Sequence, residues 1–309
     1  MSDGEGGERR PRVITPNTVI AVAPDDPLHF PLNRRQLDDL VRGALEEDGA
    51  FNDVTTIATV RPERHAFATI VARSPGVIAG LPVAVAAFRV LDPNVAIRID
   101  EEDGAPVVGG TSIMRLSGDP RALLSAERVA LNFMQRLSGV ATITARYVEA
   151  VQGTHARILD TRKTTPGLRS LEKYAVRAGG GGNHRLGLSD QVLIKDNHLA
   201  VLNGDIALAV SRAREFAPTG TRIEVECDSI QQVAAAVDAG ADIVLLDNMS
   251  PDTLRECVAL VRRRAITEAS GGVTLENVRA VADSGVDWIS VGALTHSAPA
   301  LDLAMEFGS

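Results

Sequence analysis

The segment RIEVECDSIQQVAAAVDAGADIVLLDN, residues 222–248, decides the fold class of this chain. Each end is a short apolar run, and the stretch between them, SIQQVAAAVDAG, has the apolar spacing of an amphipathic helix. Short apolar strands that alternate with helices predict a parallel sheet covered by helices. The segment is therefore one strand–helix–strand unit of an α/β protein.

The same rhythm fills the chain from about residue 156 onward. The apolar runs are ARILD, QVLIKD, RIEVECD, DIVLLDN, AITEASGG and DWISVGAL. Six such runs predict an incomplete TIM-like α/β barrel with its active site at the carboxyl ends of the strands. An open doubly wound sheet is the alternative, because a count of strands does not establish that a barrel closes.

Upstream of these repeats the pattern is mixed and predicts a smaller N-terminal α+β sandwich domain. We expect a helix over 32–47, strands over 68–80 and 111–118, and a helix over 120–137 that Asp119 caps. The expected parts are then a disordered or extended arm over 1–30, the sandwich domain over 31–140 and the barrel domain over 141–309. A last helix is expected to pack back on the sandwich domain.

Composition limits the classes of function. The chain has 309 residues, of which 45% are apolar and 23% charged, and its formal charge is −8. An acidic protein with only 3% aromatic residues is a poor candidate for binding nucleic acid or an anionic membrane. Two cysteines, the lack of a signal peptide and the lack of an apolar run of membrane length predict a protein of the reducing cytoplasm.

Positive charge gathers in one window of this acidic chain. Residues 157–198 hold eight lysines and arginines against four acidic residues, a net charge of +4, and also contain His184. The chain has only three lysines, Lys163, Lys173 and Lys195, and all of them lie in this window. Lysine offers a compact charge where the arginine fork does not fit, so the window predicts a site for a small polyanion. Chance clustering is the alternative.

The three lysines do not all carry the same interpretation. Lys163 and Lys195 follow predicted strands, so we interpret them as functional. Lys173 precedes the core-like Tyr-Ala-Val, and we interpret it as structural, in a buried pair with a residue such as Glu172.

Glycine-rich stretches supply two further signals. Four glycines at 179–182 precede His184 and Arg185 and predict either a phosphate cradle or a hinge that closes these side chains on a ligand. SGGVT (270–274) and SVGAL (290–294) end two predicted strands and lead into helices, where backbone N–H groups can bind an anion. Ordinary tight turns are the structural alternative. The turns at 270–274 and 290–294 predict a phosphate site at the ends of the last two strands.

Polar residues and a glycine come at or near the ends of the predicted strands: Asp160, Lys195, Asp196, Glu224, Glu226, Asp247, Ser270 and Gly292. Parallel strands bring such residues to one edge. A solvated rim is the favoured explanation for any single one of them, but it explains the whole set less well. Glu224 and Asp247 are suited to hold ribose hydroxyls or a magnesium ion, or else to neutralise nearby lysines. No spacing typical of a dedicated zinc or iron site, a Walker A loop or a dinucleotide fingerprint occurs. Together these features predict a barrel enzyme that binds a sugar phosphate and a second, strongly anionic partner.

Seven stretches of the chain resemble a known family. In chain order they are ERVALNFMQRLSGVAT, DTRKTTPGLRSLEKYAVRAGGGGNHRLGLSD, LIKDNH, EVE, LLDN, SGG and VGALTHSAP. From about residue 32 to the end, the chain is similar to quinolinate phosphoribosyltransferase, the decarboxylating nicotinate-nucleotide pyrophosphorylase. Two positions depart from the family pattern and bear on local loop shape: Asn52 stands where a glycine is expected before Asp-Val-Thr, and Ser189 stands where an aromatic residue is usual.

The resemblance implies a pentosyltransferase of NAD biosynthesis. Quinolinate and phosphoribosyl pyrophosphate would give nicotinate mononucleotide, pyrophosphate and carbon dioxide, with Mg²⁺. It also implies a homodimer in which each sandwich domain caps the other subunit's barrel and Arg128 reaches the partner subunit's site.

The resemblance further implies a role for each matching residue. The quinolinate carboxylates would contact Arg128, Arg162, His184, Arg185 and Lys195, with Lys163 where quinolinate meets the pyrophosphate. Glu224 and Asp247 would take the ribose hydroxyls and the metal, and Lys163, Glu224 and Asp247 are the expected catalytic residues. The 5-phosphate would bind Ser270, Gly271, Gly272, Gly292 and Ala293, with His296 close by.

Three alternatives remain. A related phosphoribosyltransferase acting on nicotinate, or a paralogue associated with molybdenum transport, would not need a second arginine for a second carboxylate. A barrel lyase or isomerase for sugar phosphates would need the turns at 270–274 and 290–294 but not the lysines. A non-catalytic sugar-phosphate sensor has little use for cations aimed at a leaving group.

Overall fold

A computed structural model of the chain describes residues 12–14, 28–61 and 65–308. The chain divides into two compact units: the first comprises Met1–Thr142 with Pro299–Ser309, and the second comprises Ile143–Ala298. The arm expected over 1–30 falls largely outside the described residues. Within it, Arg12–Ile14 form strand β1.

The first unit is built on an antiparallel sheet with the strand order β1–β4–β6–β2–β13. The strands are β1, β2 (Ala66–Ala72), β4 (Ala96–Ile99), β6 (Ser112–Gly118) and β13 (Leu303–Phe307), and a separate ribbon pairs β3 (Gly76–Val77) with β5 (Pro106–Val107). Burial alternates along β2 and β4, with Ile70 and Ile97 among the buried residues. One face of the sheet is therefore apolar and packs into the core.

Helices complete the core of this unit. They are α1 (Arg34–Glu47), the 3-10 turn η1 (Ala50–Asn52), α2 (Val54–Thr59), α3 (Leu81–Leu91) and α4 (Pro120–Ala150). Asp119 precedes α4 and accepts the backbone N–H of Arg121 at 2.8 Å, as a capping residue does. The helix contacts the sheet where Gln135 Nε2 donates to the Leu303 carbonyl at 2.8 Å. At 31 residues, α4 is longer than the helix expected over 120–137.

Two expectations for this unit are wrong. The strand expected over 68–80 ends at Ala72, because Pro75 has no N–H to donate and interrupts the run before β3. The chain does not end in a helix: Leu303–Phe307 form β13, antiparallel to β2, with Leu303 opposite Ala72. In LDLAMEF apolar residues recur at every second position, which suits a strand that completes the edge of β2.

The second unit contains a parallel sheet in the order β7–β12–β11–β10–β9–β8. Its strands are β7 (Arg157–Leu159), β8 (Val192–Ile194), β9 (Ile223–Cys227), β10 (Ile243–Asp247), β11 (Ile266–Ser270) and β12 (Trp288–Ser290). In the described residues no ladder joins the two outermost strands, β7 and β8, so the barrel stays open between them. The incomplete TIM-like barrel expected from the sequence is confirmed.

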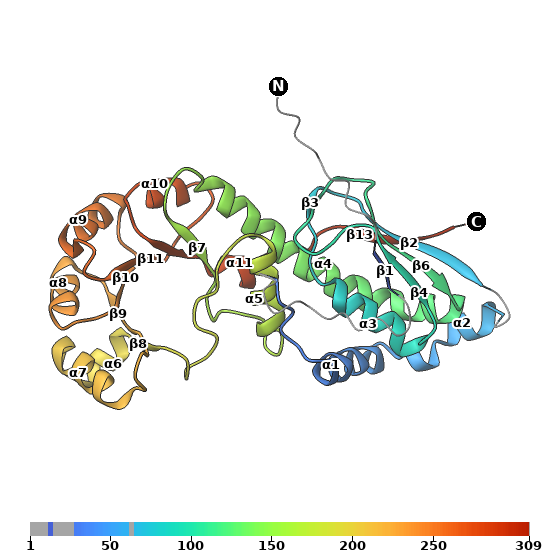
Figure 1. Cartoon of the computed structure of the whole chain (residues 1–309), viewed down its shortest axis with the longest axis horizontal. Helices are drawn as coiled ribbons and strands as arrows, with labels where there is room; N and C mark the ends of the chain where they lie inside the picture. The colour runs from blue at the N-terminus through green and yellow to red at the C-terminus, as the bar shows by residue number, and fades with distance from the viewer. Residues whose placement is uncertain (1–11, 15–27, 62–64, 309) are drawn as a thin grey trace, which may run out of the picture. The chain divides into compact units, whose positions relative to one another are not determined.

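Helices follow the strands of this sheet. They are α5 (Arg169–Ala178), α6 (Asp196–Val201), α7 (Ile206–Phe216), α8 (Ile230–Asp238), α9 (Pro251–Val261), α10 (Val278–Ala282) and α11 (Ala293–His296). Figure 1 shows α8 and α9 on the outer side of β9 and β10. Because the strands run parallel, their carboxyl ends share one edge, here called the carboxyl edge, where Asp247 lies opposite Ser270 and Ser270 opposite Ser290. No helix in the described part of the chain is long and apolar enough to cross a membrane.

Candidate active site

A buried ion pair supports the loop that carries His184. Asp160, directly after β7, is fully buried and pairs with Lys173 of α5. Asp160 Oδ1 accepts the backbone N–H of His184 at 2.9 Å, and Lys173 Nζ donates to the His184 carbonyl at 2.9 Å. Asn183 Nδ2 donates to the other Asp160 oxygen at 2.6 Å. Lys173 is thus structural, as expected, but its ion-pair partner is Asp160 rather than Glu172.

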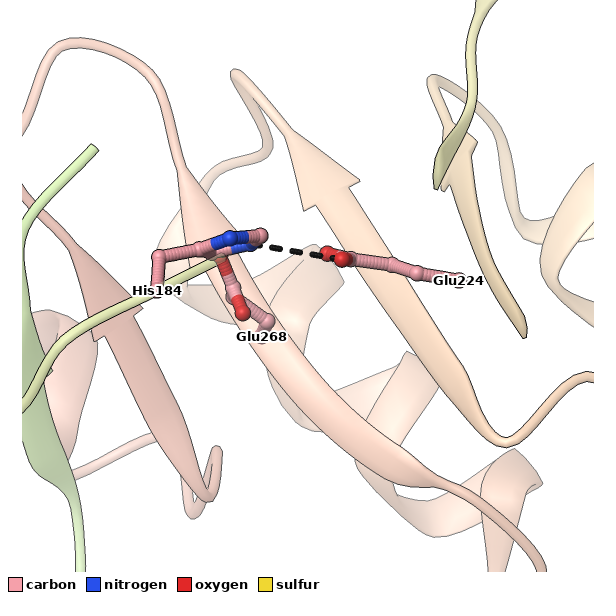
Figure 2. A group of neighbouring side chains, drawn as sticks. All are labelled: His184, Glu224 and Glu268. Atoms are coloured by element: carbon pink, nitrogen blue, oxygen red, sulfur yellow. Dashed lines mark ion pairs between the residues drawn. The ribbon is translucent and has the colours of Figure 1, made fainter. Parts of the chain in front are cut away.

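His184 lies between two buried carboxylates (Figure 2). Its Nε2 is 3.2 Å from Glu224 Oε2 and 3.4 Å from Glu268 Oε1. Both glutamates are fully buried, and the His184 side chain is only 8% exposed. Burial disfavours the imidazolium, but the hydrogen bonds and charges of Glu224 and Glu268 outweigh it and raise the pKa of His184 to about 10.

The spacing of this cluster would also let it hold a metal ion. The ligand atoms of His184, Glu224 and Glu268 lie within 4.8 Å of one another. A metal-bound histidine ring, however, usually donates its second N–H to an acceptor. Here His184 Nδ1 instead accepts the backbone N–H of Arg185 at 2.7 Å. Nδ1 can accept this N–H only while it carries no proton, so the contact belongs to the neutral ring and opposes the upward pKa shift that the glutamates cause. In the neutral ring with Nε2–H, as in the imidazolium, the nitrogen that faces the glutamates has no lone pair for a metal, so the cluster is a histidine held between two carboxylates rather than a metal centre.

Two polar side chains hold the glutamates in place. Gln191 Nε2 donates to Glu224 Oε2 at 2.7 Å, and the Ser290 hydroxyl donates to Glu268 Oε1. The remaining oxygens, Glu224 Oε1 and Glu268 Oε2, are buried and have no hydrogen-bond partner in the part of the chain that the structure describes. Burial raises the pKa of Glu224 against the opposing hydrogen bond from His184.

Arg162 and Arg185 place two positive charges near each other. Each has a buried Nε without a hydrogen-bond partner among the described residues. Burial lowers the pKa of Arg185, and the charge of Arg162 lowers it further. Two neighbouring guanidinium groups repel each other, and each leaves a buried N–H without an acceptor among the described residues. A carboxylate or phosphate ligand would offset both costs and complete this part of the site.

Lys195 and Glu226 form an ion pair at the carboxyl edge, where their side chains are 41% and 16% exposed. Glu226 follows Glu224 by two residues on β9, so both side chains lie on the same face of the sheet. Glu226 is the one nearer the carboxyl edge. The sequence places Glu226 among the strand-end residues but gives it no binding role, although the two-residue period of a strand predicts that it faces the same way as Glu224.

The turn after β11 brings its backbone close to a neighbouring turn. Gly271 has φ +90°, and a Cβ at this position would lie 2.2 Å from Asn248 Oδ1. Gly272 also has a positive φ, +59°, but open space surrounds the position of its Cβ. Asn248 in turn donates to Asp247 Oδ2 at 2.7 Å. Only glycine therefore fits at position 271, which links the end of β11 to the end of β10.

Lys163 and His296 flank Gly292 at the end of β12. A Cβ on Gly292 would lie 3.2 Å from both Lys163 Cδ and His296 Nε2. Thr295 Oγ1 donates to the Lys163 carbonyl at 2.8 Å, which ties the segment after β7 to the turn that ends at α11. Lys163 and His296 are exposed, and Ala293 begins α11. An anion bound at Gly292 would therefore have two cationic or polar side chains within reach.

Two family models match the chain. "Quinolinate phosphoribosyl transferase, N-terminal domain" matches residues 53–138, and "Quinolinate phosphoribosyl transferase, C-terminal domain" matches residues 140–306. The chain belongs to the quinolinate phosphoribosyltransferase family.

Similar proteins agree with this family. A probable nicotinate-nucleotide pyrophosphorylase [carboxylating] of Bacillus subtilis is 46% identical over 275 residues, covering 89% of this chain and 94% of that protein. The nicotinate-nucleotide pyrophosphorylase [carboxylating] of Mycobacterium leprae is 45% identical over 278 residues, covering 87% and 96%. The crystal structure of NadC from Streptococcus pyogenes has a TM-score of 0.86 at 39% identity and covers 90% of this chain and 99% of that one. Human nicotinic acid phosphoribosyltransferase, at 15% identity and a TM-score of 0.60, shares the fold alone.

The structure gathers most of the residues that the family pattern selects in the second unit, along the carboxyl edge and the segments beside it. These are Arg162, Lys163, His184, Arg185, Lys195, Asp247, Ser270, Gly271, Gly272, Gly292, Ala293 and His296. Glu224 belongs to the same unit but is fully buried. Arg128 lies on α4 within the first unit and is exposed. Glu268 and Gln191 were not among the residues expected from the sequence, and Asp160 was expected only as a strand-end residue, because their roles follow from tertiary contacts.

The two departures from the family pattern are accommodated locally. Asn52 ends η1, and its φ is not positive, so the position does not require glycine. Asp53 then begins α2 by accepting the Thr56 N–H at 3.0 Å. Ser189 is exposed beside Asp190, whose carboxylate accepts two backbone N–H groups of its own loop.

Proposed function

We infer that this chain is a decarboxylating quinolinate phosphoribosyltransferase. It transfers phosphoribosyl from phosphoribosyl pyrophosphate to quinolinate and gives nicotinate mononucleotide, pyrophosphate and carbon dioxide. The observation that carries the substrate is the pair Arg162 and Arg185, whose desolvated guanidinium groups lie near each other with unpaired donors. Two guanidinium forks suit the two carboxylates of quinolinate, and Lys195 and His184 complete the expected contacts.

The chemistry requires positioning and charge stabilisation more than proton transfer. We expect the pyridine nitrogen to attack C1 of a ribose with oxocarbenium character while pyrophosphate leaves. Lys163, beside Gly292 and His296, would stabilise the departing charge where the two substrates meet. Holding both substrates in line supplies much of the remaining acceleration. Loss of the 2-carboxylate follows, because the quaternary ring nitrogen stabilises the carbanion, which then takes up a proton.

We assign the ribose hydroxyls and a magnesium ion to Glu226 and Asp247. Both are partly exposed carboxylates at the carboxyl edge, the oxygen donors that Mg²⁺ takes together with substrate phosphates. Glu224, which was expected in this role, is fully buried and engaged by His184 and Gln191, so it suits a supporting role better. When bound, magnesium would neutralise charge on the pyrophosphate.

The 5-phosphate is assigned to the glycine turns at the ends of β11 and β12. Ser270 ends β11 and Gly271 begins the turn after it, where a side chain would collide with Asn248. A side chain at Gly292 would crowd Lys163 and His296, so glycine keeps the backbone of both turns open to a phosphate. Gly272, Ala293 and His296 complete the set that the family pattern selects. The positive charge of Lys163 next to Gly292 favours an anion at this place.

We also propose a homodimer in which Arg128 completes the partner subunit's site. Arg128 is an exposed cation on α4, in keeping with such a role. Mixing R128A with R162A, at a quinolinate concentration so low that each variant alone turns over little, tests this directly, because shared sites leave some sites with both arginines intact. Recovered activity in the mixture supports the proposal, and a mixture as inactive as either parent contradicts it.

A cytoplasmic location is proposed as well. Cys227 and Cys257 are buried and unpaired, which suits a reducing compartment. Fractionation of cells producing the full chain, with immunodetection, tests this, and recovery in a membrane or exported fraction contradicts it.

The function is tested by product identification. The protein with quinolinate, phosphoribosyl pyrophosphate and Mg²⁺ is expected to form nicotinate mononucleotide, detected by mass spectrometry, while a parallel tube with nicotinate stays unreacted. Product in the nicotinate tube alone would reject quinolinate as the substrate and favour the nicotinate-type alternative.

A further inference from the structure

Glu268 is a buried carboxylate that the proposed reaction does not use. It lies on β11, two residues before Ser270, and is fully buried. Its Oε1 accepts the Ser290 hydroxyl and lies 3.4 Å from His184 Nε2, while its Oε2 has no hydrogen-bond partner among the described residues. A buried carboxylate is costly unless it is compensated. Its presence beside an anion site therefore needs a reason.

A closed ring of contacts connects His184 to Arg185. The Arg185 N–H donates to His184 Nδ1 at 2.7 Å, and Arg185 Nη1 donates to the Gln191 carbonyl at 3.2 Å. Gln191 Nε2 donates to Glu224 Oε2 at 2.7 Å, and this oxygen lies 3.2 Å from His184 Nε2. The ring holds the Arg185 backbone while Nδ1 carries no proton, and the path through Glu224 and Gln191 holds the Arg185 guanidinium in either protonation state of His184. Glu268 contacts His184 from outside the ring.

We propose that Glu268 is a positioning residue for recognition of the dicarboxylate, because it fixes His184 and, through the ring of contacts, Arg185. Figure 2 shows the imidazole held between Glu224 and Glu268, which come from strands on either side of β10. Two acceptors on one Nε2 restrain the ring more than one acceptor does. The proposal rests on the proposed function, since it takes quinolinate as the ligand of Arg185.

Positioning and simple electrostatics predict opposite effects of removing the charge. A negative charge near an anion site repels the ligand, so Glu268→Gln would tighten quinolinate binding if charge alone mattered. If Glu268 positions His184, the same substitution loosens the ring and weakens binding. Gln keeps the volume and can still accept from Ser290, so the change is nearly isosteric.

The primary test is steady-state kinetics of full-length E268Q with both substrates. The KM for quinolinate is expected to rise about tenfold, the scale of one lost charged hydrogen bond, while the KM for phosphoribosyl pyrophosphate changes by less than about twofold. The matched control is T267V on the same strand, which removes the two hydrogen bonds that the Thr267 hydroxyl makes with Asp287 and does not contact His184. T267V should lower the melting temperature and leave both KM values unchanged. An unchanged or lower KM for quinolinate in E268Q overturns the proposal.

A second background separates action through His184 from general loosening. In H184Q, adding E268Q should change the quinolinate KM by less than about twofold, because the group that Glu268 positions is already gone. A further tenfold loss in the double variant would overturn the proposal. If E268Q fails to fold, S290A removes one support of Glu268 and should raise the quinolinate KM about threefold, a smaller loss than that of a charged partner. No change in a folded S290A would likewise overturn it.

Wild-type turnover in the same assay distinguishes failure of the proposed function from failure of the positioning role of Glu268. Absence of nicotinate mononucleotide from the wild-type reaction rejects the proposed function and this inference with it. Wild-type turnover together with an unaffected quinolinate KM in E268Q rejects the inference alone.

Discussion

The two halves of the candidate site are built in different ways. The arginine half, defined by Arg162, His184 and Arg185, consists of side chains that rest on buried charges. The glycine half, defined by Gly271, Gly272 and Gly292, consists of tight turns whose backbone is accessible because side chains are missing. The first half binds through charge, and the second binds through close approach to the main chain.

This difference teaches where each half is vulnerable. Buried charges stabilise only as complete sets, because a charge left without its partner costs several kcal/mol, on the order of 3–5. A backbone turn tolerates changes around it but not an added Cβ where space is closed or φ is positive. Substitutions should therefore act on folding and quinolinate binding in the arginine half, and on phosphoribosyl pyrophosphate binding in the glycine half.

The largest effect is expected from Lys173→Met. It leaves Asp160 buried without its counter-charge, so the free energy of unfolding should fall by about 3–5 kcal/mol. Burial raises the pKa of Asp160 and lowers the pKa of Lys173 against the attraction between them, so removal of the lysine leaves the cost of burying the carboxylate without that attraction. Urea denaturation measures the loss.

The matched variant for this comparison is Lys195→Met, since the Lys195–Glu226 pair is partly exposed. Its cost in stability should be about 0–1 kcal/mol. Equal losses in the two variants would contradict the distinction between buried and exposed pairs.

Arg162→Ala should have the next largest effect. Loss of a bidentate guanidinium–carboxylate contact is expected to raise the KM for quinolinate about 100-fold and to leave the KM for phosphoribosyl pyrophosphate within about threefold. Initial-rate kinetics with each substrate varied in turn gives both values. Arg157→Ala, an exposed arginine at the start of β7, is the control and should change neither. A larger rise in the KM for phosphoribosyl pyrophosphate than in the KM for quinolinate would show that Arg162 does not bind quinolinate, and would contradict its place in the arginine half.

Two adjacent substitutions test whether close packing of the backbone matters in the glycine half. Gly271→Ala adds a Cβ that meets Asn248 at 2.2 Å at φ +90°, so the KM for phosphoribosyl pyrophosphate should rise about 30-fold. Gly272→Ala meets only the strain of φ +59°, with open space around it, and should cost about threefold to fivefold. Initial-rate kinetics with phosphoribosyl pyrophosphate varied checks both variants. The reverse order of effects would show that close approach at Gly271 is not what the turn provides.

The smallest effect is expected in the pH dependence of stability, because protonation of His184 gives up the Arg185 N–H bond while it strengthens the contacts with the glutamates. The pKa of His184 is raised from 6.5 to about 10 by its two glutamates, after their attraction overcomes burial. The protonated ring therefore stabilises the fold fully below about pH 6.5, and this contribution is lost as the pH rises toward 10. The melting temperature of wild type should exceed that of H184Q most at pH 6, and the gap should shrink toward pH 10. A gap that is constant or that widens would contradict the ion-paired assignment.

The parts of the site that the sequence predicts are those that depend on position along a strand. The βα rhythm is enough to place Lys195, Asp247, Ser270 and Gly292 near one edge, because parallel strands end together. The partner of Lys173 could not be predicted, since the Asp160–Lys173 pair is a tertiary contact. Asn183, from the loop before His184, hydrogen-bonds the same carboxylate. Glu268 gives no signal in ITEAS, because its burial depends on His184 and Ser290 from other elements.

The fold shows the same division. The strands of the second unit are predicted by local apolar runs, whereas β13 depends on the available edge of β2, which lies more than two hundred residues earlier. The expected last helix failed for this reason: a short segment takes the structure of the edge it meets.

The central claim is that the cationic side chains of residues 157–198 bind quinolinate and that phosphoribosyl transfer precedes decarboxylation. It is tested most directly by release of labelled carbon dioxide from quinolinate labelled at the 2-carboxylate, with Mg²⁺, in the presence and absence of phosphoribosyl pyrophosphate. Release that requires phosphoribosyl pyrophosphate is the predicted result. Release without it, or none in either tube, would contradict the account.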